Sequence, residues 1–117
     1  MDTFLPVIRS LALVESVLLI YFSLLPASLV PGTGLAPPGW PLEHFLAYLA
    51  YGLLLSGALL ARSKKALLAA IIIGAGMGLL TETIQLFVPT RSFEISDWLA
   101  DLAGTALGAA AYRLKGP

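Results

Sequence analysis

The sequence from Thr81 to Gly108 reads TETIQLFVPTRSFEISDWLADLAGTALG, and it holds four of the seven acidic residues of an otherwise apolar chain. The pattern predicts a helix, a loop and a second helix, because Pro89 removes a backbone donor and interrupts a regular helix. The rest of the chain is therefore interpreted as the helices that close around these polar groups.

The acids in this stretch have helical spacing. Glu82 and Gln85 stand three residues apart, while Asp97 and Asp101 stand four apart, so each pair shares one face of its helix. Glycines prolong both faces, at Gly74 and Gly78 before Glu82 and at Gly104 and Gly108 after Asp101. Glycine faces are contact faces between helices in lipid, so we expect the acids to point into a helix bundle.

Composition favours lipid as the surrounding solvent. The 117 residues are 58% hydrophobic, and the mean hydropathy is +0.89. The formal net charge is zero, and no basic run suggests nucleic acid as a partner. The chain contains no cysteine, so it has neither a disulfide framework nor a thiolate metal site.

Four apolar segments predict an all-α, four-helix transmembrane bundle, with spans at about 4–25, 42–61, 66–87 and 96–114 in a single domain, 1–117. A cleaved signal peptide is the alternative for the first segment, but its start lacks a basic region. The segment 26–41 contains five prolines and three glycines and is predicted to be a loop, with Trp40 suited to the membrane interface. Ser96 is the predicted N-cap of the last helix.

The basic residues predict the orientation. Six of the seven, all except Arg91, lie at the start of the first segment, between the second and third segments, or at the end of the chain. By the positive-inside rule, both termini are expected in the cytoplasm. The polar groups of the 81–108 stretch, together with His44, then gather near the outer surface.

The candidate site combines a histidine from the second segment with acids from the third and fourth segments. If the protein is an enzyme, His44, Glu82 and Asp97 are the predicted catalytic residues, because they could exchange protons during hydrolysis or transfer. The predicted substrate-binding residues are Gln85, Arg91, Ser96 and Asp101. Arg91 is expected to pair with Glu82 or Asp97, in a network with His44 at its edge.

Less specific interpretations remain open. Asp97 fits any first helical turn, and Arg91 fits a membrane anchor. Glu15, near the middle of the first span, suits either a proton path or a buried neutral carboxyl. A histidine with several carboxylates could bind a divalent metal or pass a proton, but the spacing matches no closed metal motif, so metal and cofactors stay unknown.

The order of several short motifs resembles the VanZ-like family of small membrane proteins. The resemblance extends from Ser23-Leu24-Leu25-Pro26 to Gly108, through His44-Phe45 with Tyr48 and Gly52, Glu82-x-x-Gln85-x-Phe87-x-Pro89-x-Arg91-Ser92, Ser96-Asp97 and Gly104-x-x-x-Gly108. The chain departs from the family pattern in two places. It has Leu42-Glu43 where the family commonly has Asp-Lys, and Asp101 where the family commonly has Asn.

The resemblance implies a multi-pass protein of a prokaryotic plasma membrane, in a family named for resistance to the glycopeptide teicoplanin. It favours recognition of a membrane lipid or a lipid-linked envelope molecule, with a small membrane-embedded enzyme as the alternative. A transporter is disfavoured because four spans leave little room for two gates. The glycine faces would also permit a homo-oligomer.

Overall fold

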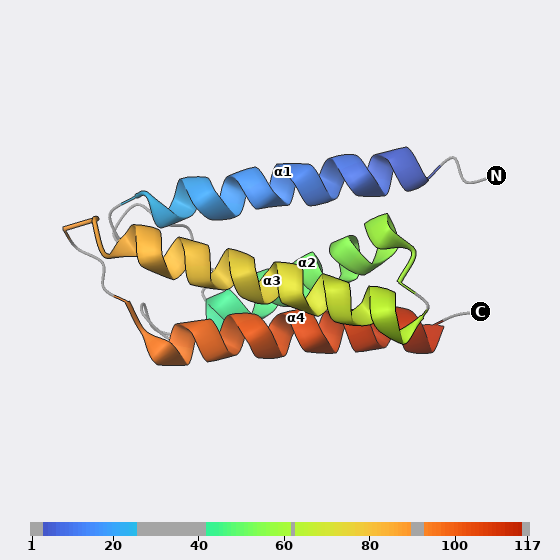
Figure 1. Cartoon of the computed structure of the whole chain (residues 1–117). Coiled ribbons are helices and arrows are strands. Elements are labelled where there is room, and N and C mark those ends of the chain that lie inside the picture. Colours follow the sequence, from blue (N-terminus) through green and yellow to red (C-terminus); the bar gives the residue numbers. More distant parts are fainter. Residues whose placement is uncertain (1–3, 26–41, 62, 90–92, 116–117) are drawn as a thin grey trace.

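The computed structural model describes residues 4–25, 42–61, 63–89 and 93–115, which form four α-helices (Figure 1). The helices are α1 (Leu5–Ser23), α2 (Leu42–Leu59), α3 (Lys64–Gln85) and α4 (Ile95–Lys115), and no strand occurs in these ranges. The prediction of an all-α protein with four helices is confirmed. The predicted loop 26–41 and Arg91 lie outside the described residues.

Local chemistry explains most of the helix ends. Pro6 stands in the first turn of α1, where a missing backbone donor costs nothing. Ser63 caps α3, since its hydroxyl accepts a hydrogen bond from the backbone N–H of Ala66 (3.1 Å). The predicted N-cap of α4 is wrong: the helix begins at Ile95, and Ser96 already lies within the first turn. The backbone oxygen of Glu94 accepts the first bonds of α4, from the N–H groups of Asp97 and Trp98.

Glycines set the distance between α2 and α4. A Cβ atom at Gly104 would collide with the carbonyl oxygen of Phe45, and one at Gly108 would collide with that of Leu49. A Cβ atom at Gly52 would in turn meet the carbonyl oxygen of Thr105. The two backbones therefore touch, and this close approach fixes how α4 is rotated against α2.

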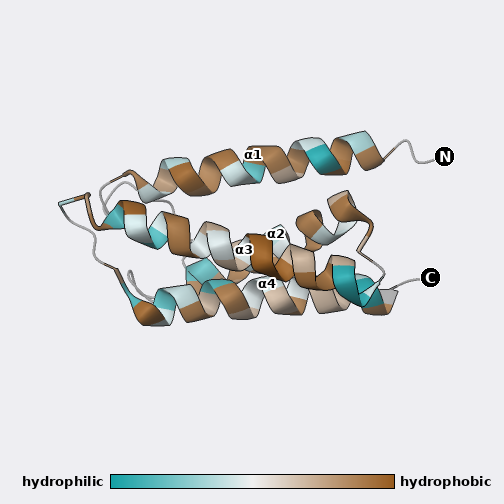
Figure 2. Ribbon diagram, in the orientation of Figure 1, coloured by the Kyte–Doolittle hydropathy of each residue, from teal (hydrophilic) through white to brown (hydrophobic). Residues whose placement is uncertain are grey.

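The interior is small and the surface is apolar. Tyr48, Tyr51, Leu55 and Ala70 form the hydrophobic core, while only Ala12 and Ser23 of α1 are buried. Figure 2 shows hydrophobic residues along all four helices, and large apolar side chains are exposed on their outer faces. By length and composition, α1, α2 and α3 are each able to cross a membrane. An apolar surface of this kind suits lipid as the surrounding solvent.

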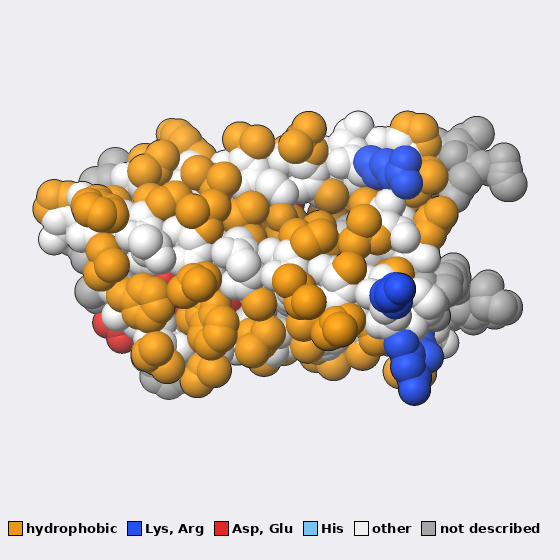
Figure 3. Space-filling view, in the orientation of Figure 1, with side chains coloured by type: hydrophobic (Ala, Val, Ile, Leu, Met, Phe, Trp, Pro, Cys, Tyr) orange, Lys and Arg blue, Asp and Glu red, His pale blue; other side chains and the backbone are white. Residues whose placement is uncertain are grey.

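Charge is separated along the bundle axis. The first residues of α1 and the last residues of α4 lie at one end of the molecule, which we call the basic end (Figure 1). Figure 3 shows Lys and Arg side chains at the basic end and acidic side chains toward the opposite one. That opposite end, where α2 and α4 begin and α3 finishes, is called the polar end below.

Candidate functional site

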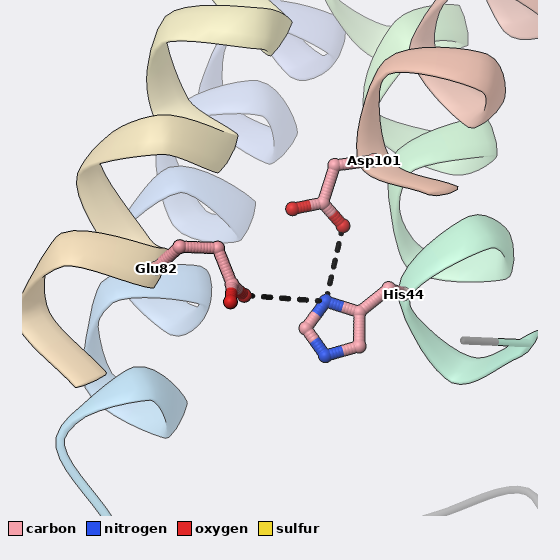
Figure 4. A group of neighbouring side chains, drawn as sticks. All are labelled: His44, Glu82 and Asp101. Carbon is pink, nitrogen blue, oxygen red and sulfur yellow. Dashed lines mark hydrogen bonds and ion pairs between the residues drawn. The ribbon is translucent and has the colours of Figure 1, made fainter. Parts of the chain in front are cut away.

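His44 lies in the first turn of α2, at the polar end. The contact between Gly104 and the Phe45 carbonyl brings this turn against α4. The His44 ring consequently reaches Asp101, and its Nδ1 atom lies 3.0 Å from Asp101 Oδ1, within hydrogen-bond distance (Figure 4). Asp101 is completely buried, so α4 presents this carboxylate to the interior of the bundle.

Glu82 approaches the same ring from α3. Its side chain is fully buried, and Oε2 lies 3.9 Å from His44 Nδ1 (Figure 4). The other oxygen, Oε1, accepts a hydrogen bond from the backbone N–H of Glu94 (3.1 Å). Glu82 thus contacts both the histidine and the residue that precedes α4.

Asp97 completes the group from the first turn of α4. Its Oδ2 atom lies 3.6 Å from His44 Nε2, and its side chain is 13% exposed. Three carboxylates from two helices therefore surround one imidazole from a third. We call His44, Glu82, Asp97 and Asp101 the acid–histidine cluster.

One oxygen of the cluster has no partner. Asp101 Oδ2 is buried and makes no hydrogen bond within the described part of the chain. A Cβ atom at Gly78 would lie 2.9 Å from this oxygen, so the glycine of α3 leaves the space that it occupies. A buried polar atom without a partner is costly and calls for a specific explanation.

Two further hydrogen bonds join the helices that surround the cluster to one another. The hydroxyls of Tyr48 and Thr81 lie 3.3 Å apart, which links α2 to α3 at the residue before Glu82. The indole of Trp98 donates to the backbone oxygen of Ala75 (3.1 Å), which links α4 to α3. The cluster therefore sits among three helices that are tied to one another.

The remaining predicted site residues have different environments. Gln85 is buried on α3, and Ser96 is exposed. Arg91 lies outside the described residues, so its pairing with an acid stays a prediction. The α2–α4 contact places the His44 ring among the three carboxylates of the described cluster, and the expected network with Arg91, in which His44 stands at the edge, stays a prediction.

Sequence reasoning gave Asp101 and Trp98 too little weight. Asp101 makes the shortest contact to His44, although it was expected only to bind substrate. The available signal was its position on one stripe with Gly104 and Gly108, because that stripe faces α2. Trp98 had no comparable signal, since its bond to Ala75 depends on how α3 and α4 pack.

An apolar cavity opens at the same end of the molecule. Its volume is about 480 Å³, within the range of small-molecule sites. It lies between the last residues of α1 and the end of α3, and its lining consists of Leu24, Thr83, Ile84, Phe87, Val88 and Pro89. Thr83 is next to Glu82 in sequence, so adjacent residues of α3 contribute to the cavity and to the cluster.

Apolar helices that enclose a partly buried histidine and buried acids define a helical membrane protein with a polar site inside its bundle. The comparison with family models then names the group: the model of the VanZ/LLP1 family matches residues 8–116, almost the whole chain, and this protein belongs to that family. The predicted family is thereby confirmed. Neither the comparison with curated proteins nor the comparison with solved structures gives a match.

Proposed function

We propose that this protein recognises a lipid-like or lipid-linked molecule of the cell envelope at the outer face of a prokaryotic plasma membrane. The observation that carries the proposal is the apolar cavity at the polar end, the end at which the acid–histidine cluster also lies. An amphiphile needs both environments, because its chain requires an apolar groove and its head group requires hydrogen-bonding partners.

The packing of α4 against α2 supports a multi-pass arrangement in the membrane. Helix α2 is apolar enough to span, and α4 packs against it from Phe45 to Leu53 through Gly104 and Gly108. Helix α4 is not among the three described helices that qualify as spans by length and composition, and we propose that its packing against α2 carries it through the membrane. The acids of α4 are then shielded from lipid by α2 and α3.

The chemistry of the cluster suits a particular head group. Three carboxylates and one imidazole offer acceptors and negative charge, which favour ammonium, amide N–H and hydroxyl groups. Arg91 and Gln85 are proposed contacts for an acidic or amide group of the same ligand. A lipid-bearing glycopeptide such as teicoplanin, which carries an acyl chain, combines these groups, and this agrees with the resistance for which the family is named.

Native mass spectrometry of the protein in mild detergent tests the proposal. We expect a lipid-sized adduct on the wild-type protein, and we expect Thr83→Trp to remove it, because an indole at Thr83 fills the cavity. Leu68→Trp is the matched control, since Leu68 lies on the exposed face of α3 near the basic end. Equal adducts on all three proteins would contradict a ligand site in the cavity.

One observation favours an enzyme as the second candidate. The 3.0 Å contact with Asp101 orients the His44 ring, and Nε2 then faces Asp97 at 3.6 Å. A carboxylate that holds a histidine in place is a common arrangement for proton transfer. This candidate is tested by comparing lipid extracts of cells that express the wild-type protein with those of cells that express His44→Gln. An enzyme should make one lipid species rise or fall in the wild-type extract relative to the variant, and identical extracts would reject this candidate.

A further inference from the structure

The acid–histidine cluster contains a set of donors suited to a metal ion. His44, Glu82 and Asp101 each offer one ligand atom, and these atoms all lie within 4.8 Å of one another. Two ligands of a Zn²⁺ ion, each about 2.1 Å from it, can stand no more than about 4.2 Å apart. His44 Nδ1 and Asp101 Oδ1 already meet this limit at 3.0 Å, and Nδ1 and Glu82 Oε2 meet it at 3.9 Å.

We infer that His44 Nδ1 and the carboxylates of Glu82 and Asp101 bind one divalent transition-metal cation of the Zn²⁺ or Mn²⁺ type. The site uses residues of the proposed function but goes beyond it, because recognition of a lipid in the cavity does not require a metal. The three ligands come from α2, α3 and α4, so a bound ion would join these helices at the polar end.

The unpaired oxygen of Asp101 is independent support. Oδ2 belongs to a side chain with no exposed surface, and it has no hydrogen-bond partner among the described residues. Figure 4 shows the Asp101 carboxylate directed into the space between Glu82 and His44. A cation in this space supplies the partner that Oδ2 lacks.

Charge balance also favours a cation. Asp101 is completely buried, and the imidazole of His44 is its one basic neighbour within 4 Å among the described residues. The described Lys and Arg side chains lie at the basic end, far along the bundle axis (Figure 3). Buried acids need a counter-charge, and a divalent ion provides two positive charges.

The donor types select the class of metal. Imidazole nitrogen suits Zn²⁺, Fe²⁺ and other transition ions, whereas Mg²⁺ and Ca²⁺ prefer oxygen ligands. An incoming ion replaces the Nδ1 proton, because a ligating histidine must be neutral at that atom. Asp97 lies on the Nε2 side and stabilises the proton there, as carboxylates beside metal-bound histidines commonly do.

Metal analysis of the full-length protein in mild detergent is the direct test. After chelation and dialysis, the protein is titrated with Zn²⁺ or Mn²⁺, and Co²⁺ serves as a spectroscopic probe. We expect one ion per chain and Co²⁺ absorption bands that report nitrogen and oxygen ligands. Glu82→Gln and Asp101→Asn should each weaken binding about 100-fold or more, since even residues behind the ligands contribute 10-fold to 100-fold.

Glu43→Gln is the matched control, because Glu43 is a carboxylate next to His44 that is not part of the cluster. It should bind the ion like the wild type. Wild-type protein that binds no stoichiometric ion would overturn the inference, as would equal loss in Glu43→Gln. If Asp101→Asn does not fold, Glu82→Gln and the wild-type Co²⁺ spectrum still decide the question. Lipid adducts are measured separately, so a metal-free protein that retains its lipid would reject this inference alone.

Discussion

At the scale of single residues, Glu82 has a structural role beside its place in the cluster. Its Oε1 atom accepts the backbone N–H of Glu94, and this bond joins the end of α3 to the start of α4. Removing a buried acceptor leaves the donor unsatisfied, which costs about 1–3 kcal/mol. The two roles can be separated by the choice of substitution.

Glu82→Ala should lower the free energy of unfolding by about 1–3 kcal/mol relative to Glu82→Gln. The glutamine keeps a side-chain oxygen that can accept the Glu94 N–H, whereas alanine removes the acceptor. Thermal unfolding of both variants in the same mild detergent measures the difference. Equal stability would show that the Glu94 bond contributes nothing to the fold.

Leu60 holds a strained backbone conformation at the end of α2. Its φ angle is +52°, in the left-handed region where a Cβ atom is unfavourable, and the Ala61 N–H bonds back to the Ser56 oxygen (2.8 Å). Leu60→Gly should therefore stabilise the protein by about 1 kcal/mol. Leu59→Gly is the control, since Leu59 is still helical, and it should destabilise. A lower melting temperature for Leu60→Gly than for Leu59→Gly would contradict this explanation.

Sequence reasoning named all four residues of the cluster but not their arrangement. The i, i+4 spacing placed Asp97 and Asp101 on one face, and the structure brings both to His44. The sequence could not show that Asp101 would lie closest, because that depends on the rotation of α4 against α2. The pairing of Arg91 and the functional roles of these residues stay predictions.

At the scale of helices, the contact between α2 and α4 depends on glycine. Gly104→Ala should destabilise the protein by about 1–3 kcal/mol, because its methyl group collides with the Phe45 carbonyl. Gly76→Ala is the same change on α3, where nothing lies within 4 Å of the added atom. It should be neutral or stabilise by roughly 0.5–1 kcal/mol. Unfolding in detergent compares them, and similar losses would show that the α2–α4 contact is not tight.

Helix existence could be predicted better than helix ends. Long apolar runs indicated four helices near 4–25, 42–61, 66–87 and 96–114. The observed helices begin and end within two residues of these bounds. The start of α4 was misplaced because local capping preference selected Ser96. The observed start involves a hydrogen bond from Glu94 to Glu82, twelve residues away, which no local pattern reveals.

At the scale of the whole molecule, the separation of charge predicts orientation. The described basic residues Arg9, Lys64, Lys65 and Arg113 belong to the start of α1, the start of α3 and the end of α4, and these helix ends lie at one end of the molecule (Figures 1 and 3). Short loops that carry Lys or Arg near the ends of membrane spans stay on the cytoplasmic side. The basic end should therefore face the cytoplasm, and the polar end should face outward.

The absence of cysteine from the sequence makes this orientation directly testable. Lys65→Cys introduces a thiol at the basic end, and Ser96→Cys introduces one at the polar end, both at exposed positions. In intact cells, a membrane-impermeant maleimide should label Ser96→Cys but not Lys65→Cys, and both should react after the membrane is opened. Labelling of both from outside would reject the four-span arrangement. Labelling of Lys65→Cys alone would reverse the orientation and place the acid–histidine cluster on the cytoplasmic side, where it could not meet an envelope molecule from outside.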